Sequence, residues 1–166
     1  MKTGLWAKCT DPDDICSVLE QIPVCAGGNN FDAVAFLHGV CGIFALALHD
    51  RFDYRLDWVL DDEYDGAFKN NPWAHLVHVF CSITDGEDIL ATVDARGISD
   101  DFELFIDEFA DFVDYPGVWV SPPSREELER EMIREVGAET YKEYYQAAMT
   151  IIEEHPDWYS AGEDDL

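Results

Sequence analysis

The chain has 166 residues, and its 36 Asp and Glu against 10 Lys and Arg give a formal net charge of −26. Because the few cations are scattered and form no basic patch, this charge argues against direct binding to nucleic acid or to an anionic membrane surface. Hydrophobic residues make up 48% and aromatic residues 13% of the chain, which excludes a disordered acidic polymer and predicts a folded domain with a negative surface.

The first 30 residues show little regular pattern. Residues 1–28 are predicted to be irregular apart from a helical turn over Asp13–Gln21, and the sequence Gly27-Gly28-Asn29-Asn30 predicts a loop. Met1–Asp14 holds no apolar run of the length found in a secretory signal. We therefore expect a cytoplasmic protein.

Phe31–Arg51 is the most apolar part of the chain. Its length and its Ala and Leu content predict a helix, with Asn30 or Asp32 at the N-cap. Glycines lie two residues before and one residue after Cys41, and each costs a helix about 1 kcal/mol relative to Ala. We therefore expect the helix to break there, with a new N-terminus close to Cys41.

Tyr54–Leu60 has the pattern of a strand, and a hairpin is predicted further along the chain. His75–Ile83 and Asp88–Ala95 are strand-like, and Asp85-Gly86 between them is a strong hairpin signal. Both strands carry apolar residues on both faces. This hairpin is therefore expected to lie centrally in a covered sheet.

Helices are predicted over much of the remaining chain. Asp100–Val113 is amphipathic, with four Phe residues on one side, and Gly117–Val120 is a candidate final strand. Ser124 and Glu127 form a capping-box pattern that opens a further helix through about Val136.

The order of helix, strands and helices predicts an α+β fold. We divide the chain into an α+β core over residues 1–120 and a C-terminal helical hairpin over residues 121–166. The second helix of this hairpin covers Glu139–Glu154, and we expect the hairpin to pack on the core and to end in a frayed acidic tail.

The five cysteines are Cys9, Cys16, Cys25, Cys41 and Cys81. An odd number argues against a complete disulfide framework, and the absence of a Cys-x-x-Cys motif gives no support to a zinc site. The acidic run Asp61–Gly66 lacks the spacing of a calcium loop. No metal and no cofactor is therefore expected, and the free thiols fit a reducing compartment.

Cys41 is the candidate nucleophile. A catalytic thiol reacts as the thiolate, and a helix N-terminus lowers the pKa of a thiol through its dipole and its free N–H groups. Small residues lie beside Cys41, and the apolar helix that follows would anchor it in a core. A buried structural cysteine is the alternative interpretation.

The predicted hairpin supplies the two partners of such a thiol. His78 is the candidate general base, and Asp94 on the next strand is expected to accept a hydrogen bond from its Nδ1. A three-residue turn places His78 opposite Asp94, whereas a two-residue turn places it opposite Val93. His75, the competing imidazole, is expected on the other face, because side chains alternate along a strand.

Three short motifs follow one another in the chain: Cys41-Gly-x-Phe-Ala-x-Ala-Leu, His78-Val-Phe and Asp94-Ala-Arg-Gly. Their order resembles that of the papain-like cysteine hydrolases, and it is most similar to the bacterial and phage branch related to NlpC/P60 and transglutaminase-like enzymes. The resemblance covers roughly residues 29–98. It implies a papain-like core in which a helix packs on a small antiparallel sheet.

The resemblance also implies a function. A thiol hydrolase or acyl-transfer enzyme of this kind (a peptidase, an amidase or a deamidase) would form a thioester on Cys41, with His78 as general base and acid and Asp94 as the orienting residue. Such enzymes need an upstream polar side chain to stabilise the oxyanion. The candidates for that role are Gln21, Asn29 and Asn30.

The charge leaves a second interpretation open. Acidic surfaces accompany solubility and adaptation to salt, but small phage-encoded inhibitors of restriction and CRISPR systems also resemble this composition. A non-enzymatic inhibitor of that kind would imitate DNA and occupy a basic channel of its target. A third possibility combines the two, namely an enzyme whose acidic surface recruits a basic protein substrate.

Overall fold

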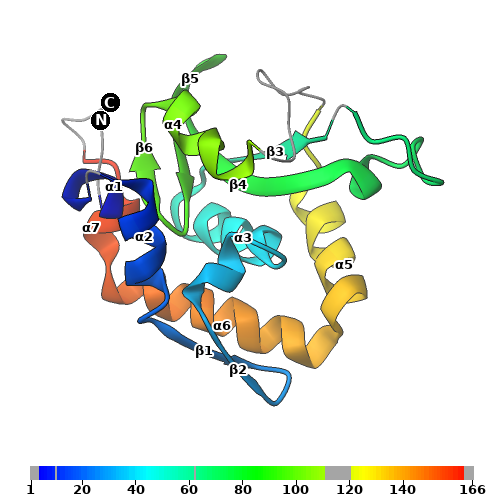
Figure 1. Ribbon diagram of the computed structural model, residues 1–166, viewed down its shortest axis with the longest axis horizontal. Coiled ribbons are helices and arrows are strands. Elements are labelled where there is room, and N and C mark those ends of the chain that lie inside the picture. The colour runs from blue at the N-terminus through cyan, green and yellow to red at the C-terminus, as the bar shows by residue number, and fades with distance from the viewer. Residues whose placement is uncertain (1–3, 10, 62, 111–120, 163–166) are drawn as a thin grey trace.

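A computed structural model of the protein describes residues 4–9, 11–61, 63–110 and 121–162. The architecture is α+β, as predicted. Helix α3 (Cys41–Phe52) lies at the centre, with a four-stranded antiparallel sheet on one side and α6 (Ala138–Glu154) on the other (Figure 1). No helix in these ranges is long and apolar enough to cross a membrane.

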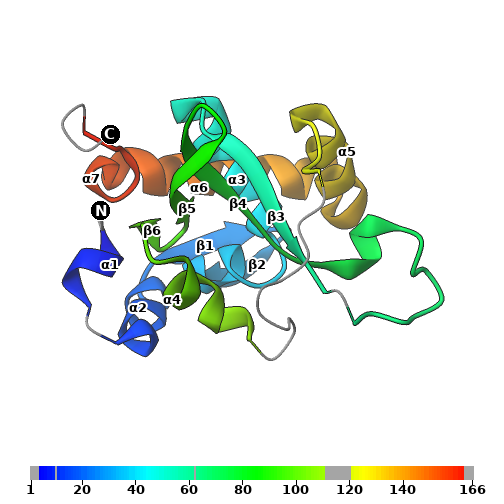
Figure 2. The ribbon, with the colours of Figure 1, turned by 90° about the horizontal axis from the view of Figure 1, so that it is seen from above.

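Short helices and two sheets complete the fold (Figures 1 and 2). The other helices are α1 (Leu5–Lys8), α2 (Pro12–Leu19), α4 (Phe102–Ile106), α5 (Arg125–Val136) and α7 (Pro156–Tyr159), and the 3-10 turns are η1 (Ala33–Phe36), η2 (Pro72–His75) and η3 (Asp107–Phe109). The larger sheet has the order β3 (Arg55–Leu60), β4 (Leu76–Asp85), β5 (Asp88–Asp94) and β6 (Gly97–Ser99), and β1 (Pro23–Ala26) pairs with β2 (Asn29–Asp32) in the smaller sheet.

The N-terminal segment is more regular than predicted. The helical turn expected over Asp13–Gln21 corresponds to α2, whose N-cap, Asp11, accepts the backbone N–H of Asp13 at 3.0 Å. The predicted loop is the turn of the β1–β2 hairpin. Gly27 and Gly28 have φ values of 59° and 75° there, which two-residue hairpin turns of this hand require.

The expected break before Cys41 is present. The carboxylate of Asp32 caps η1 by accepting the Val34 N–H at 3.0 Å, and α3 then begins at Cys41. The predicted helix therefore does not start at Phe31, which belongs to β2. The first eight residues of α3 are all buried, because the helix has the larger sheet on one side and α6 on the other.

The β4–β5 hairpin lies inside the larger sheet, as predicted, but both predicted registers are wrong. The turn consists of Gly86 and Glu87 alone, and Gly86 adopts a φ of 62°. The register then shifts, so that Ile83 pairs with Ala91 and Leu90 is left as an extra residue in β5. Such a β-bulge cannot be read from turn chemistry alone.

The capping box is confirmed. The hydroxyl of Ser124 accepts the Glu127 N–H at 3.2 Å, and the Glu127 carboxylate accepts the Ser124 N–H at 2.9 Å. Gly137, with φ 86° and ψ 151°, ends α5 and begins α6. The two helices of the predicted hairpin therefore turn sharply and form an open L around α3 (Figure 1).

The C-terminal helices pack on the core next to Cys41. A Cβ atom on Gly42 would lie 2.8 Å from Sδ of Met132 and 3.0 Å from Cδ1 of Leu128. The absence of a side chain at Gly42 thus lets α5 approach α3 closely. This contact joins residues 121–162 to the core.

The helix predicted over Asp100–Val113 is shorter where it is described, because α4 gives way to η3 at Asp107. Residues 111–113, the candidate strand Gly117–Val120 and the acidic tail after residue 162 lie outside the described residues. Strand β6 was not predicted. It is only three residues long, which is too short for a clear alternation of polar and apolar residues.

Candidate active site

Cys41 is the first residue of α3, as the sequence predicts. It is 5% exposed, and its Sγ accepts the backbone N–H of Val79 in β4 at 3.4 Å. The ladder between β4 and β5 ends two residues away, at the pair Cys81–Val93. The thiol therefore lies beside β4 where pairing with β5 has stopped.

His78 lies in β4, one residue before the strand position that contacts the thiol. It is fully buried, and its ring stacks on that of Phe109 with a centroid distance of 4.3 Å. Nε2 lies 3.0 Å from Oδ2 of Asp94, which is also buried. The structure therefore brings together the imidazole and carboxylate that the sequence predicts.

The nitrogen atoms are used in the opposite way to the prediction. Asp94 contacts Nε2 of His78 and not Nδ1. Nδ1 is buried, and no hydrogen bond of good geometry reaches it from the described residues. Since Cys41 and His78 also perturb one another's pKa, Nδ1 is the nitrogen left for the thiol.

The surroundings favour the charged forms of both groups. Burial alone would raise the pKa of the Cys41 thiol, but the imidazole of His78 and the N–H groups of Val79 and Gly42 outweigh it, so the pKa is lowered. Burial would lower the pKa of His78, but Asp94 and Cys41 outweigh it, so that pKa is raised. The pair is therefore biased toward thiolate and imidazolium.

Asp94 is also held by Arg96, a residue that was not predicted to belong to the site. Nη2 and Nε of Arg96 lie 2.7 and 3.1 Å from Oδ2 of Asp94, and the backbone N–H of Arg96 donates to Oδ1 at 2.8 Å. Despite burial, the guanidinium and His78 hold the pKa of Asp94 well below its usual range. Asp94 is thus fixed as a carboxylate that orients the ring and does not take its proton.

Arg96 is enclosed by aromatic rings. It is 1% exposed, and its Cζ lies 4.8, 4.6 and 5.6 Å from the ring centroids of Trp6, Phe105 and Phe109. Nη2 also donates to the carbonyl oxygen of Phe105 at 3.0 Å. The sequence carries one signal for this role. Arg96 is a single cation in an apolar region, two residues after Asp94, and a buried Arg requires a partner.

The predicted oxyanion residues are not brought to the thiol. Asn29 donates to the carbonyl oxygen of Gly27 at 3.2 Å, and the side-chain oxygen of Asn30 accepts a hydrogen bond from the Cys25 thiol at 3.1 Å. Gln21 is exposed in the turn before β1. Within the described chain no hydrogen bond links these three side chains to Cys41, and their role stays a prediction.

His75 lies outside β4, in η2. Its Nδ1 and Nε2 lie 3.0 and 2.6 Å from the carbonyl oxygens of Asp61 and Lys69. The ring therefore holds the loop before β4 and is turned to backbone acceptors. His78 is the imidazole that interacts with the thiol.

The other cysteines have different environments. Cys81 is equally buried, but it donates to the carbonyl oxygen of Ala45 at 3.3 Å, and burial with the charge of Asp57 raises its pKa. Burial and Glu108 raise the pKa of Cys16 to about 11. Cys41 is therefore chemically distinct from Cys81, although both thiols lie between α3 and β4.

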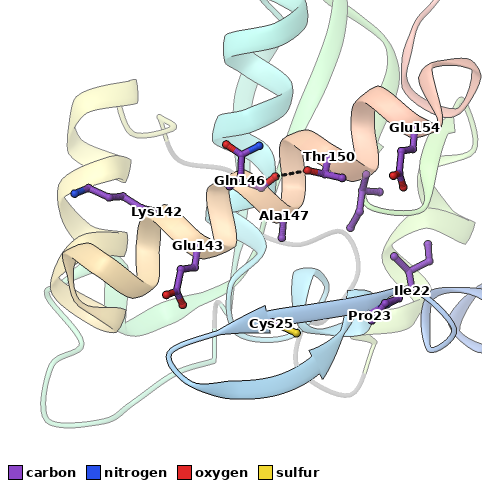
Figure 3. A pocket seen from close by; sticks show the side chains of 10 residues that line it. Ile22, Pro23, Cys25, Lys142, Glu143, Gln146, Ala147, Thr150 and Glu154 are labelled. Carbon is purple, nitrogen blue, oxygen red and sulfur yellow. Dashed lines mark hydrogen bonds between the residues drawn. The ribbon is translucent and has the colours of Figure 1, made fainter.

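Two hollows lie in different places relative to this site. One, of about 290 Å³, borders the site and is lined by Gly39, Asp61, Val77 and Phe109 among others. The other, of about 710 Å³, lies between β1 and α6, with Cys25 on its wall (Figure 3). Neither hollow has a triad residue in its lining, but the first is lined by Val77 and Gly39, which lie one residue before His78 and two residues before Cys41, whereas the second is lined by residues of β1, α6 and the turn before β1.

No protein-family model, no curated protein and no solved structure matches the chain. Among the described residues, no group of three or more His, Cys, Asp and Glu side chains is arranged to hold a metal ion.

Proposed function

We propose that the protein is an acyl-transfer enzyme with Cys41 as its nucleophile, His78 as general base and acid, and Asp94 as the orienting residue. The observation that carries the proposal is the arrangement of these three groups. A thiol with a lowered pKa stands at a helix N-terminus, beside an imidazole whose Nε2 is 3.0 Å from a carboxylate. This is the constellation that thiol nucleophiles use.

In the first step, the Cys41 thiolate attacks a carbonyl carbon of the substrate and forms a C–S bond. The carbonyl π electrons move to oxygen. When the tetrahedral intermediate collapses, the bond to the leaving amine or ammonia breaks, and the proton on Nδ1 of His78 passes to that leaving group. The product that remains is a thioester on Cys41.

In the second step, neutral His78 takes a proton from water, and the resulting hydroxide attacks the thioester. The C–S bond then breaks and returns its electron pair to sulfur, so that a carboxylic acid leaves and the thiolate–imidazolium pair is restored. A different acceptor in place of water would give transfer rather than hydrolysis. Asp94 keeps the ring in one orientation through both steps.

The N-terminal turn of α3 is the best candidate to stabilise the oxyanion. Val40, at the N-cap, provides no side-chain hydrogen bond to this turn, and the positive end of the helix dipole favours negative charge. The backbone N–H of Gly42, which already interacts with the thiol, and that of Cys41 itself are the candidate donors. They would act in place of a polar side chain.

The resemblance to papain-like enzymes suggests a peptidase, an amidase or a deamidase. A net charge of −26 would attract a basic protein substrate through its long-range field. The test is hydrolysis of a small uncharged ester and of the matching amide by the protein and its variants. Cys41→Ala should lose turnover with both, and Cys81→Ala, the control for a buried thiol, should retain it.

The alternative is an acidic inhibitor that acts by imitating DNA. It is favoured by the charge of −26 and by the complete burial of His78. Such a protein would compete with DNA for one basic surface of a target and would need no thiol. A biological effect that Cys41→Ala leaves unchanged would favour this alternative over the enzyme.

A further inference from the structure

The Cys41 site is closed to a substrate in the structure. Cys41 is 5% exposed and His78 is 0% exposed, so no carbonyl group can approach the thiol while the imidazole also reaches the leaving group. Acyl transfer needs both contacts at once. If the site is active, one of the side chains that enclose it must therefore move.

Phe109 separates the site from the neighbouring hollow. Its ring stacks on the imidazole of His78 at 4.3 Å and an interplanar angle of 24°, and the same residue lines the 290 Å³ hollow. Val77 and Gly39, which lie one residue before His78 and two residues before Cys41, also line this hollow. One aromatic ring thus stands between the hollow and the imidazole.

The element that carries Phe109 is short, although Phe109 is itself 1% exposed and its ring also lies 5.7 Å from the ring of His38 and 5.6 Å from Cζ of Arg96. Phe109 ends η3, a single 3-10 turn. The carboxylate of Glu108 beside it lies 2.8 Å from Nε2 of His38 and 3.9 Å from the Cys16 thiol. The side chain of Glu108 is 22% exposed and that of His38 is 44% exposed. Polar contacts that water reaches add little stability, so we expect the His38–Glu108 contact to be a weak latch.

The preceding helix is tied through its backbone to the Arg96–Asp94 pair. Phe105 of α4 is fully buried, packs on Phe80 at 5.2 Å, and accepts the guanidinium of Arg96 at its carbonyl oxygen. Arg96 in turn is anchored to Asp94. Movement is therefore expected in η3, while α4 and the Arg96–Asp94 pair stay in place.

We propose that Phe109 is a movable cover on the Cys41 site, that the His38–Glu108 pair latches it, and that the 290 Å³ hollow is the entrance through which the substrate's acyl group reaches the thiol. This proposal rests on the proposed function, since it concerns access to the same thiol. The proposal also limits the size of the acyl group that the site accepts. The acyl portion next to the scissile bond must fit between Gly39 and Val77 once the ring has swung away.

The test is the rate at which iodoacetamide alkylates Cys41, followed by mass spectrometry of the Cys41 peptide over a range of pH. At high pH the thiol is fully ionised, and the plateau rate then reports access rather than pKa. Phe109→Ala should raise this plateau about tenfold or more, because local opening is no longer required. Glu108→Gln, which weakens the latch, should raise it less.

Two controls accompany these variants. Phe102→Ala removes a ring from α4 without touching the cover, and it should leave the plateau unchanged. Cys81 in the same sample reports general unfolding. If Phe109→Ala exposes Cys81 as well, Phe109→Leu, which keeps an apolar side chain but no ring, decides the question together with Glu108→Gln.

The cover is overturned if these variants alkylate Cys41 at the wild-type plateau rate. That outcome would leave the proposed function intact, because alkylation consumes the thiol once and requires no turnover. Conversely, a raised plateau in a protein that hydrolyses neither ester nor amide would support the cover and count against the enzyme.

Discussion

His78 and Asp94 share one face of the larger sheet although they do not lie opposite each other in the ladder. Their contact, 3.0 Å between Nε2 and Oδ2, is diagonal. Beyond the bulge the ladder pairs Cys81 with Val93. The next position in this register places Asp94 opposite Phe80. Because every second residue of a strand points to the same side, His78 and Phe80 face the same way.

The bulge at Leu90 makes this contact possible. Near the turn, Asp85 pairs with Asp88 and Thr84 with Ile89. Had that register continued without the extra residue, Asp94 would lie opposite Val79 and on the face away from His78. One inserted residue in β5 thus decides whether the imidazole has a carboxylate partner.

The first prediction concerns this residue. Deleting Leu90 should destabilise the protein by more than about 4 kcal/mol or prevent folding, because a one-residue slip moves the side chains of β5 beyond the bulge, Asp94 among them, to the other face. Leu90→Ser keeps the residue count and should cost at most about 1 kcal/mol, since Leu90 is 39% exposed. Denaturant unfolding of the two variants measures the difference. Equal stability of both would mean that the bulge does not set the register.

The second prediction concerns pH. The lowered pKa of Cys41 means that its alkylation rate should rise with a midpoint below about 8.5, the usual value for a thiol. The raised pKa of His78 means that turnover should persist above about pH 6.5, the ordinary midpoint of an imidazole. Turnover should then fall as His78 loses the proton that it gives to the leaving group.

The ion pair also links stability to pH. The lowered pKa of Cys41 stabilises the folded protein above the pKa of the unfolded thiol, and this stabilisation is lost as the pH falls through the pKa of the folded thiol. The raised pKa of His78 stabilises the folded protein below about pH 6.5, and that stabilisation is lost as the pH rises through the pKa of the folded imidazole. His78→Asn should move the alkylation midpoint of Cys41 upward. A midpoint at or above that of an unperturbed thiol in the wild-type protein would contradict the ion pair.

The third prediction separates the roles of Asp94 and Arg96. Asp94→Asn should reduce turnover by up to about 10⁴ through loss of ring orientation, and it should destabilise the fold by roughly 3–5 kcal/mol by leaving Arg96 buried without its counter-ion. Adding Arg96→Met should recover part of the stability and none of the turnover. A double-mutant cycle on unfolding and on turnover measures both. Additive losses of stability would show that the two side chains are not coupled.

The fourth prediction concerns the acidic surface. If the field of the −26 charge recruits a basic protein, the association rate should fall steeply with salt, because the Debye length shrinks from about 10 Å at 0.1 M to about 3 Å at 1 M. Turnover of a small uncharged ester should change little over the same range. Association that is insensitive to salt would assign the surface to solubility instead.

The sequence predicts the fold best where one local pattern decides the outcome. The capping box at Ser124 and the break before Cys41 rest on hydrogen bonding and glycine chemistry within a few residues, and both are present. The open angle between α5 and α6 was not predicted, because it depends on a single glycine and on packing around α3.

The sequence predicts which residues form the candidate site, but it does not predict how they are arranged. Asp94 contacts His78 and the imidazole acts on the pKa of Cys41, yet by a register that turn chemistry does not reveal and through the other ring nitrogen. Arg96 and Phe109 were missed as parts of the site. Their roles come from three-dimensional contacts with residues distant in sequence, such as Trp6, and periodicity carries no information about such contacts.

Formation of an acyl-enzyme on Cys41 tests the central proposal most directly. The protein is mixed with an activated ester, p-nitrophenyl acetate, quenched in acid during turnover, digested and examined by mass spectrometry. We expect acetylation of the Cys41 peptide that hydroxylamine removes, its absence in Cys41→Ala, and no acetylation of Cys81. Turnover that continues in Cys41→Ala, or a Cys41 that acquires no acetyl group while the folded protein is intact, would contradict the assignment of Cys41 as the nucleophile.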